Sequence, residues 1–440
     1  MLTHADPAAT FYPGCQKCFK KMGQKRLAVI SECSFPDSPL SPGAGRRVLA
    51  LLTQGILAIM LAACGTTGSA TSVPALRELG TKDLDDLLVG SSIQATRGTD
   101  LVWMRSEIDA ALRDGVTFRM VAVDDVPDDW LTVSLAGVGG GGEWEHVTER
   151  IRREGLEVRP GFLLEAVDAL SEYLGRAFDA VIRAEAGEAT VYALLAAARL
   201  GVPIVDACLS GRARPEIQQQ VTSLVGISTV PAALVSMWGD VVIIERIADE
   251  NRAEELARGI SMVSGPGMAM AMTPMTGREV RRGVIQGSLS EAILYGQTVR
   301  GALENHENPV EALQRVSGAT KRFHGIVTRS EIEGRKGFNV GWITISGSGP
   351  YTGEQYDIYI KNEQIAGWKN RETDVVPPNM LWVLDPHTGL PVTGTPPGIV
   401  PEGKEVSVLR ILARGAWDSR KGSKLMGPSH FRLENLKLPE

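Results

Sequence analysis

The hydrophobic pattern from residue 80 to residue 317 alternates between helical and strand-like periods. The clearest unit is an apolar run at 178–185, a helical stretch at 189–201 that ends at a glycine, and the run Pro-Ile-Val-Asp-Ala at 203–207. Strand–helix–strand connections are almost always right-handed, and strands that are apolar throughout are typical of parallel sheets covered on both faces. The pattern therefore predicts a three-layer α/β domain with a largely parallel sheet over 80–317.

Further elements of this domain follow from the same periods. Helices are expected at 81–88, 103–113, 142–155, 162–175, 215–226, 250–265 and 278–305, and strands at 118–125, 131–138 and 240–247. The methionine-rich stretch 265–275 is interpreted as packing in the core or in a loop, with a pocket wall as the alternative.

The pattern changes after about residue 318 to short alternating runs separated by Gly, Pro and Asn. Such runs occur at 325–333, 338–347, 356–368, 380–385 and 405–413. Several short strands at this spacing predict an all-β, barrel-like domain over 318–440.

The first 79 residues are predicted to be a disordered extension that carries a lipoprotein-like signal at 46–64. Two arginines precede an apolar run of about fifteen residues, which suits a signal peptide better than a membrane span. The run ends Leu-Ala-Ala-Cys-Gly, which would make Cys64 a lipidation site and the protein a cell-envelope lipoprotein. The alternative is a cytoplasmic protein whose translation starts later, so that residues 1–45 are not part of it.

Composition narrows the function classes. The chain is 43% hydrophobic and 22% charged, with a net charge of −6, which is typical of a soluble globular protein and argues against a nucleic-acid partner. A membrane is expected only through the lipid anchor. The Cys15–Cys18 pair resembles half of a zinc ribbon, and the histidines lack metal-ligand spacing, so the cofactor is unknown and a divalent metal has no clear motif.

Charged residues gather where two strands of the predicted sheet end. Glu185 closes one strand and Asp206 the next. If the strands are neighbours, the backbones of the two residues lie one strand spacing apart, about 5 Å, at the edge where open sheets bind ligands. Arg212, Arg214 and Glu216 follow directly. We expect Asp206, Glu185, Arg212 and Glu216 to be catalytic and Arg214 to bind substrate; the alternative is an internal ion-pair network in which Asp206 caps a turn.

Four further residues are candidates for substrate binding. Gly140 and Gly141 follow a strand and open a helix, where exposed N–H groups can hold an anion; a flexible turn is the other interpretation. Gly187 follows Glu185 in a Glu-x-Gly segment. Cys208 lies near the arginines, where a thiolate can be reactive, although a lone cysteine at a strand end is more often a small packing residue.

Seven short motifs in a fixed order resemble the S-methyl-thiohydantoin desulfurase-like family over residues 80–438. They are Glu-Ala-Gly (185–187), Pro-Ile-Val-Asp-Ala (203–207), Gly-Arg-Ala-Arg-Pro-Glu (211–216), Gly-Phe-Asn-Val-Gly (337–341), Ile-Lys-Asn-Glu (360–363), Leu-Asp-Pro-His-Thr-Gly (384–389) and Gly-Pro-Ser-His-Phe (427–431). The resemblance implies an α/β domain followed by a barrel-like domain, hydrolytic removal of sulfur from a thiohydantoin ring, and association with hydantoinase or oxoprolinase enzymes. The chain departs from the family at 93–99, where a glycine run is expected, and at Cys208, where an acid is expected.

Together these observations predict a hydrolase that acts on a thiohydantoin- or hydantoin-like ring. Asp206 or Glu185 would activate water, and Arg212 would hold a substrate carboxylate or the negative charge that develops on the ring. The alternatives are a non-catalytic small-molecule-binding protein and a hydantoinase-associated regulatory subunit. A homo-oligomer is compatible with the sequence.

Overall fold

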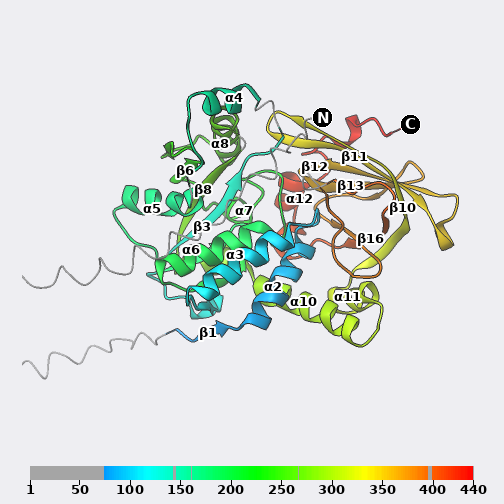
Figure 1. The fold of residues 1–440 in the computed structure, drawn as a ribbon, viewed down its shortest axis with the longest axis horizontal. Coiled ribbons are helices and arrows are strands. Elements are labelled where there is room, and N and C mark those ends of the chain that lie inside the picture. The colour runs from blue at the N-terminus through cyan, green and yellow to red at the C-terminus, as the bar shows by residue number, and fades with distance from the viewer. Residues whose placement is uncertain (1–73, 142–144, 160, 266, 395–398, 440) are drawn as a thin grey trace, which may run out of the picture. The chain divides into compact units, whose positions relative to one another are not determined.

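The computed structural model describes residues 74–141, 145–159, 161–265, 267–394 and 399–439 (Figure 1). The predicted signal, the Cys15–Cys18 pair and the lipidation site Cys64 lie outside these residues. Residues 76–79, which fall within the predicted extension, form strand β1 and pair with residues 118–121. No helix among the described residues has the length and apolar character needed to cross a membrane.

The described residues form a mixed sheet of nine strands in the order β1-β2-β5-β4-β3-β8-β6-β7, with β9 paired to β5. The four neighbouring strands β2, β5, β4 and β3 run parallel to one another. All other strand pairs of this sheet are antiparallel. The strands are β1 (Leu76–Leu79), β2 (Phe118–Val121), β3 (Leu131–Val138), β4 (Ala180–Arg183), β5 (Ile204–Cys208), β6 (Ala232–Ser236), β7 (Val241–Ile244), β8 (Met268–Thr276) and β9 (Ile285–Gln286). The predicted α/β domain is confirmed, with its parallel part in the centre of the sheet.

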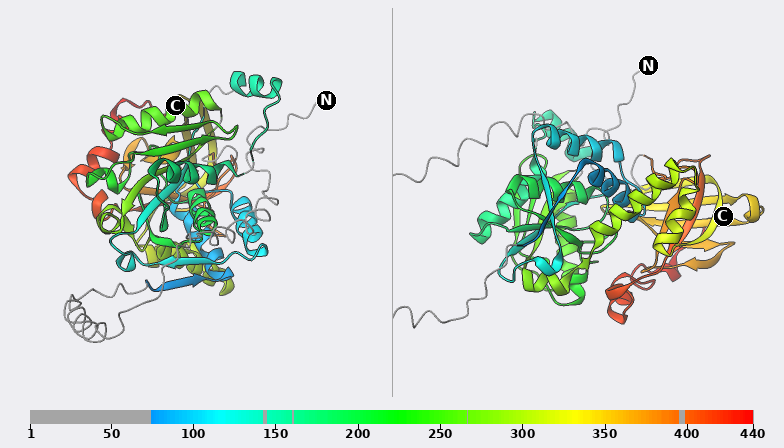
Figure 2. Two further views of the ribbon diagram at one scale, coloured as in Figure 1. Left: turned by 90° about the vertical axis from the view of Figure 1, so that its left-hand side faces the viewer. Right: turned by 90° about the horizontal axis from the view of Figure 1, so that it is seen from below.

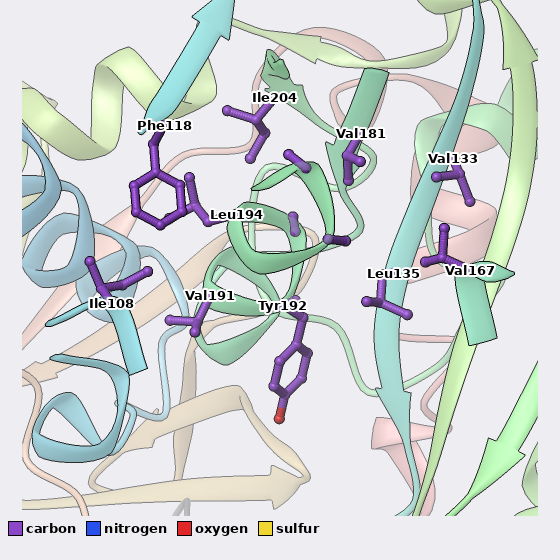
Figure 3. Close-up of a cluster of buried hydrophobic side chains, with 14 of the residues drawn as sticks. Ile108, Phe118, Val133, Leu135, Val167, Val181, Val191, Tyr192, Leu194 and Ile204 are labelled. Carbon is purple, nitrogen blue, oxygen red and sulfur yellow. The ribbon is translucent and has the colours of Figure 1, made fainter. Parts of the chain in front are cut away.

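Helices cover both faces of this sheet. The helices are α2 (Thr81–Gln94), α3 (Leu101–Arg113), α4 (Glu145–Arg153), α5 (Phe162–Leu174), α6 (Glu188–Leu200), α7 (Val221–Leu224), α8 (Glu250–Ser264), α9 (Gly277–Gly283), α10 (Ser288–Glu304) and α11 (Pro309–Ser317). Val181 packs with Val191 and Leu194 of α6 (Figure 3). Because side chains alternate along a strand, Ile182 packs on the opposite face. Helices α2, α3, α5, α6 and α10 share the first core, and α8 and α9 cover the other face.

Three segments differ from their predicted structure. The predicted helix at 215–226 is wrong except for the short α7. In the segment before α7, side chains of Gln219 and Glu254 bind the N–H groups of Glu216 and Ile217. The predicted helix at 278–305 is interrupted by β9. The methionine-rich stretch is the buried strand β8, in which Met270 faces the α8 side and Ala271 faces the α5–α6 side.

The C-terminal part is an antiparallel, half-barrel sheet of seven strands among the described residues, in the order β14-β13-β12-β11-β10-β16-β15. The strands are β10 (Thr320–Arg335), β11 (Phe338–Gly347), β12 (Gln355–Lys361), β13 (Glu363–Lys369), β14 (Glu372–Val375), β15 (Met380–Leu384) and β16 (Glu405–Ile411), followed by α12 (Arg420–Met426). Phe323, Ile343, Tyr356 and Val408 lie in the core of this sheet. The predicted barrel-like domain is confirmed.

The α/β part and the second sheet lie side by side (Figure 2). They contact one another through both apolar and polar groups. Ile93 and Tyr295 pack in one cluster with Trp382, and the Trp417 indole N–H donates to the Ser210 carbonyl at 2.9 Å. These contacts place residues of the second sheet against the carboxyl ends of the parallel strands.

Candidate functional site

A cavity of about 180 Å³ lies where the parallel strands end and the second sheet begins; we call it the acid cavity. Loops after β3, β4 and β5 supply one side, and the turns of the second sheet supply the other. Its lining residues are Arg97, Ala136, Gly137, Val138, Gly139, Gly140, Glu185, Arg214, Pro215, Glu216, Ile217, Arg258, Met272, Asn339, Asn362 and Glu363. The position matches the strand-end edge at which the sequence predicts a site.

Glu363 enters the acid cavity at the start of β13 and is 3% exposed. The Thr96 hydroxyl donates to its carboxylate at 3.2 Å, and Arg97 Nε lies 3.0 Å from Glu363 Oε1. Burial raises the pKa of the Glu363 carboxyl to about 7 although the charge of Arg97 opposes the shift, and the nearby carboxylate of Glu185 adds to it. A carboxyl with this pKa exchanges a proton near neutral pH.

Glu185 follows β4 and reaches the same cavity from the sheet edge. The backbone N–H of Arg214 donates to Glu185 Oε2 at 2.9 Å. Burial raises the pKa of the Glu185 carboxyl, while the charge and the N–H of Arg214 act against the shift. The cavity therefore holds two acids whose protonated forms are favoured by burial.

The positive charges of two arginines, Arg97 and Arg214, lie beside these two acids. Burial disfavours the charged form of Arg97, but the carboxylates of Glu188 and Glu363 outweigh burial and raise its pKa. Burial lowers the pKa of Arg214, and the charge of Glu185 opposes that shift. Arg214 Nη1 also donates to Gln220 Oε1 at 2.6 Å, which fixes its direction. Paired acids and fixed cations in a small cavity suit proton transfer to and from a bound polar group.

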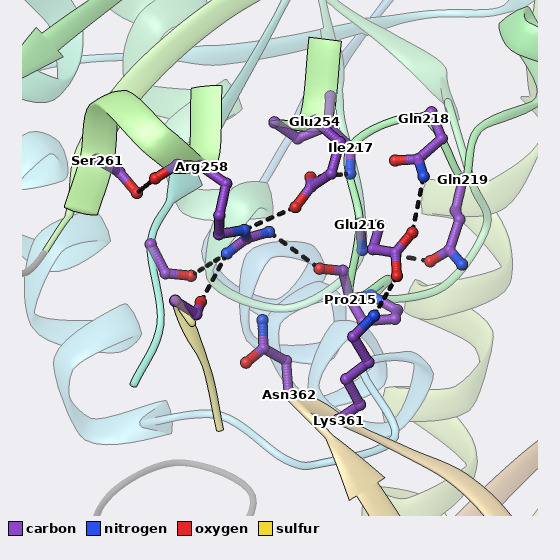
Figure 4. A network of polar contacts seen from close by, with 12 residues as sticks. Pro215, Glu216, Ile217, Gln218, Gln219, Glu254, Arg258, Ser261, Lys361 and Asn362 are labelled. Atoms are coloured by element: carbon purple, nitrogen blue, oxygen red, sulfur yellow. Dashed lines mark hydrogen bonds and ion pairs between the residues drawn. The ribbon is translucent and has the colours of Figure 1, made fainter. Parts of the chain in front are cut away.

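Glu216 lies between the acid cavity and a second, larger groove of about 760 Å³. Lys361 forms an ion pair with it, and the Gln218 amide donates to it at 2.7 Å (Figure 4). His430 Nε2 lies 2.8 Å from Glu216 Oε2. Although burial acts in the opposite direction, the His430 hydrogen bond and the charge of Lys361 lower the pKa of Glu216 to about 2. Glu216 is therefore a fixed negative charge.

Arg258 of α8 forms hydrogen bonds with three segments that surround the acid cavity. Its guanidinium donates to the carbonyls of Gly139 at 2.6 Å, Gly337 at 3.0 Å and Pro215 at 3.1 Å, and it pairs with Glu254 at 2.6 Å (Figure 4). The three carbonyls belong to the β3 loop, the β10–β11 turn and the segment after β5. One side chain thus joins the α/β part to the second sheet beside the cavity.

Glu185 lines the acid cavity and Asp206 does not, whereas the sequence analysis expects both at one site. Asp206 Oδ1 accepts the N–H groups of Leu289 at 2.9 Å and Ser290 at 3.0 Å, and Oδ2 accepts the Ser290 hydroxyl at 2.5 Å. Asp206 therefore caps the first turn of α10, and it lines neither the acid cavity nor the adjoining groove. This geometry matches the capping interpretation of Asp206, with α10 as the capped element.

Arg212 and Cys208 are buried beside the cavity but do not line it. Arg212 donates to the carbonyls of Ala213 and Pro378, each at 3.1 Å; burial lowers its pKa to about 10, opposed by the charge of Glu363. Cys208 Sγ lies 3.7 Å from the Ser210 hydroxyl within the core. The position of Cys208 matches its packing interpretation.

The predicted binding glycines have different surroundings. A Cβ at Gly140 would lie 2.2 Å from the Gly337 carbonyl oxygen, and one at Gly141 would lie 2.4 Å from Gly334 Cα. Both glycines thus permit the β10–β11 hairpin to approach, and of the two only Gly140 lines the acid cavity. The Gly187 N–H donates to the Ser91 hydroxyl at 2.9 Å, so this group already has a partner outside the cavity.

The sequence analysis does not identify several residues that line the acid cavity or the adjoining groove. Glu363, Lys361 and His430 come from the second sheet and the C-terminal segment, far along the chain from the strand ends. The only signals for them in the sequence are the motifs at 360–363 and 427–431, which carry the family resemblance. The described residues contain no cluster of three or more His, Cys, Asp or Glu side chains placed to hold a metal ion.

Comparison with known proteins supports the fold and gives the family. A crystal structure of a protein from Chromobacterium violaceum, a structural genomics target, superposes with a TM-score of 0.64 at 21% identity, over 82% of this chain and 98% of that chain. No curated protein sequence matches. The model of the S-Me-THD-like N-terminal domain matches residues 82–246, and that of the S-Me-THD-like C-terminal domain matches residues 248–438. The chain therefore belongs to the S-Me-THD-like, or S-methyl-thiohydantoin desulfurase-like, family.

Proposed function

We propose that the protein is a hydrolase that replaces the sulfur substituent of a thiohydantoin-type ring by oxygen in the acid cavity. The observation that carries the proposal is the pair Glu185 and Glu363, two carboxyls of raised pKa that share one cavity with Arg97 and Arg214. The family name supports a thiohydantoin-related role.

In this proposal Glu363 is the general base and Glu185 the general acid. Glu363 takes a proton from water as the water oxygen bonds to the ring carbon that carries sulfur, and the C=N electron pair moves to the ring nitrogen. The C–S bond then breaks as the ring carbonyl forms. One water proton ends on the ring nitrogen and the other on the departing thiol, so an S-methyl substrate gives a hydantoin and methanethiol. A base with a pKa near the working pH is the most effective.

Arg214 and Arg97 have the supporting roles. The negative charge that develops on the ring is placed among fixed cations, which stabilise it without reorganising. Arg97 belongs to the segment 93–99 that departs from the glycine run of the family, and together with Thr96 it contacts Glu363. We propose that this departure tunes the base.

The test is turnover of an S-methyl-thiohydantoin by the full chain, with thiol release followed by a thiol-reactive dye and the hydantoin by chromatography. We expect Glu363→Gln to lower kcat by about 10²- to 10⁴-fold, the usual contribution of a general base. Glu372→Gln, on the exposed side of β14, is the matched control and should leave turnover unchanged. Wild-type rates in Glu363→Gln would reject the assignment of Glu363 as the base.

The same experiment distinguishes two alternative functions. Binding of the ring compound with no product from the wild-type chain would favour a non-catalytic binding protein. Activity that appears only after a hydantoinase or oxoprolinase is added, together with co-purification of the two, would favour a partner subunit.

A further inference from the structure

Arg183, the last residue of β4, is a buried cation that the proposed mechanism does not use. It is 0% exposed. Among the described residues, no carboxylate lies within ion-pair distance of its guanidinium, and all its hydrogen-bond partners are neutral. A buried charge costs free energy unless other polar groups compensate it, so the partners of Arg183 indicate what this residue does.

Four hydrogen bonds join Arg183 to three helices. Nη1 donates to the hydroxyls of Ser91 in α2 and Thr190 in α6, each at 3.2 Å. Nη2 donates to Gln94 Oε1 at the end of α2, at 2.7 Å, and to the Ser288 carbonyl at the start of α10, at 2.9 Å. Hydrogen bonds from a charged donor are stronger than those between neutral groups, so one guanidinium holds three helix ends against β4.

The Ser91 hydroxyl links Arg183 to the segment that carries Glu185. Ser91 Oγ accepts the Gly187 N–H at 2.9 Å and lies 2.6 Å from the Thr190 hydroxyl. Arg183 is two residues before Glu185 in the chain, and Gly187 is two residues after it. The turn that brings Glu185 to the acid cavity is therefore held on both sides by one buried network.

Gln94 links Arg183 to the groups that hold Glu363. Thr96 and Arg97 follow Gln94 closely in the chain, and both contact the Glu363 carboxylate. Thr96 has a φ of +63°, which a β-branched residue rarely adopts. Such a conformation persists only where surrounding groups hold it. The side chain of Gln94, which binds both Arg183 and α10, anchors the chain directly before this residue.

We infer that Arg183 is a positioning residue, which fixes both acids of the acid cavity although it does not line that cavity. Ser91 connects it to Glu185, and Gln94 connects it to the partners of Glu363. The inference rests on the proposed function for the roles of the two acids. It adds a residue on which the placement of both depends.

The first test breaks the two links one at a time. Gln94→Met loosens the contact of Arg97 with Glu363, and the charge of Arg97 opposes the raised pKa of Glu363. The rise of kcat/KM with pH should therefore move upward, by about 0.5–1 pH unit. Ser91→Ala loosens Glu185, whose charge adds to the raised pKa, so the rise should move downward. Both variants keep the other charged groups that act on this carboxyl, which are Arg212 and Glu188.

The second test replaces Arg183 itself. Arg183→Lys keeps the positive charge, but a single ammonium cannot reach four acceptors on three helices. We expect kcat to fall by about 10- to 100-fold with a much smaller change in KM, the result of misplaced catalytic groups. Arg199→Lys is the matched control, because Arg199 lies at the other end of α6 and pairs with Asp168. It should leave kcat unchanged.

A purely structural role would give a different result. It would lower the unfolding free energy of these variants while kcat per folded molecule and its pH dependence stayed at the wild-type values. An unshifted pH profile in Gln94→Met, or shifts of the same sign in Gln94→Met and Ser91→Ala, would therefore overturn the inference. Because the link variants change neutral side chains, they keep the test open even if Arg183→Lys fails to fold.

A measurement without turnover separates this inference from the proposed function. The pH dependence of the unfolding free energy, compared with and without Glu363→Gln in each background, reports the titration of Glu363 directly. The expected opposite shifts in Gln94→Met and Ser91→Ala without turnover by the wild type would support the inference and reject the hydrolase proposal. Wild-type turnover without those shifts would reject the inference alone, and the absence of both would reject both.

Discussion

Glu363 Oε1, at the start of β13, lies 3.0 Å from Arg97 Nε, which follows helix α2. Glu363, from the second sheet, thus forms an ion pair with Arg97 of the α/β part. Both residues line the same cavity as Glu185, which comes from the edge of the first sheet. The acid cavity exists only because these two parts of the chain contact one another.

The raised pKa of Glu363 gives activity and stability opposite pH dependences. As a base, Glu363 works when ionised, so turnover should rise with pH through about 7. The folded protein holds the Glu363 proton more tightly than the unfolded chain, so stability from this group is present below about pH 4.5 and is lost as pH rises to about 7. The unfolding free energy of the wild type relative to Glu363→Gln should therefore fall by on the order of 1–3 kcal/mol from pH 5 to pH 8, measured by urea denaturation. A relative stability that does not change with pH would contradict the raised pKa.

Asp206 should matter for stability rather than chemistry, because its carboxylate caps α10. Asp206→Ala is expected to lower the unfolding free energy by about 1–2 kcal/mol. Asp206→Asn keeps an oxygen acceptor and should recover part of that loss. Turnover per folded molecule should remain near wild type in both variants; a loss of 100-fold or more in the stable Asn variant would return Asp206 to the mechanism.

Glu216 should stabilise the protein at neutral pH through Lys361 and His430. Its pKa of about 2 in the folded protein is below the ordinary value of 4.5, so its contribution is present above about pH 4.5 and is lost as pH falls toward 2. Glu216→Gln should lower the unfolding free energy by on the order of 1–3 kcal/mol at pH 7. The difference between the two proteins should shrink at pH 3, and an equal difference at both pH values would argue against the low pKa.

The glycines after β3 should be intolerant of side chains because the second sheet approaches them closely. In Gly141→Ala the new Cβ would meet Asn339 Oδ1 at 2.3 Å and Gly334 Cα at 2.4 Å, so the hairpin must move away from the acid cavity. We expect Gly141→Ala to lower the unfolding free energy by about 1–3 kcal/mol, measured by thermal denaturation. We also expect it to lower kcat, because the hairpin that moves borders the acid cavity.

Gly301→Ala is the control for this prediction. Gly301 lies within α10, and a Cβ added there would meet no neighbouring atom within 4 Å, so alanine should raise stability by up to about 1 kcal/mol. Equal behaviour of the two alanine variants would contradict the close approach at Gly141.

Part of the candidate site could be predicted from local sequence. Glu185 and Arg214 follow buried parallel strands, and the carboxyl ends of such strands form the ligand-binding edge of an open sheet. Asp206 follows the same pattern, but its carboxylate is bound by α10, a helix more than eighty residues later in the chain. The rule that ligands bind at the carboxyl ends of parallel strands predicts the edge of the sheet. It does not predict which side chains at that edge already form hydrogen bonds with other elements.

By itself, the sequence determined the alternation of helices and strands, the change to an all-β part near residue 318 and the strand ends that carry charge, because these depend on periodicity and nearby residues. Only the tertiary structure decided that Glu363, Arg97 and Arg258 surround Glu185 and that β8 enters the first sheet. Contacts between residues hundreds of positions apart depend on how two sheets pack. Burial between those sheets, which no local pattern encodes, is what raises the pKa of Glu363.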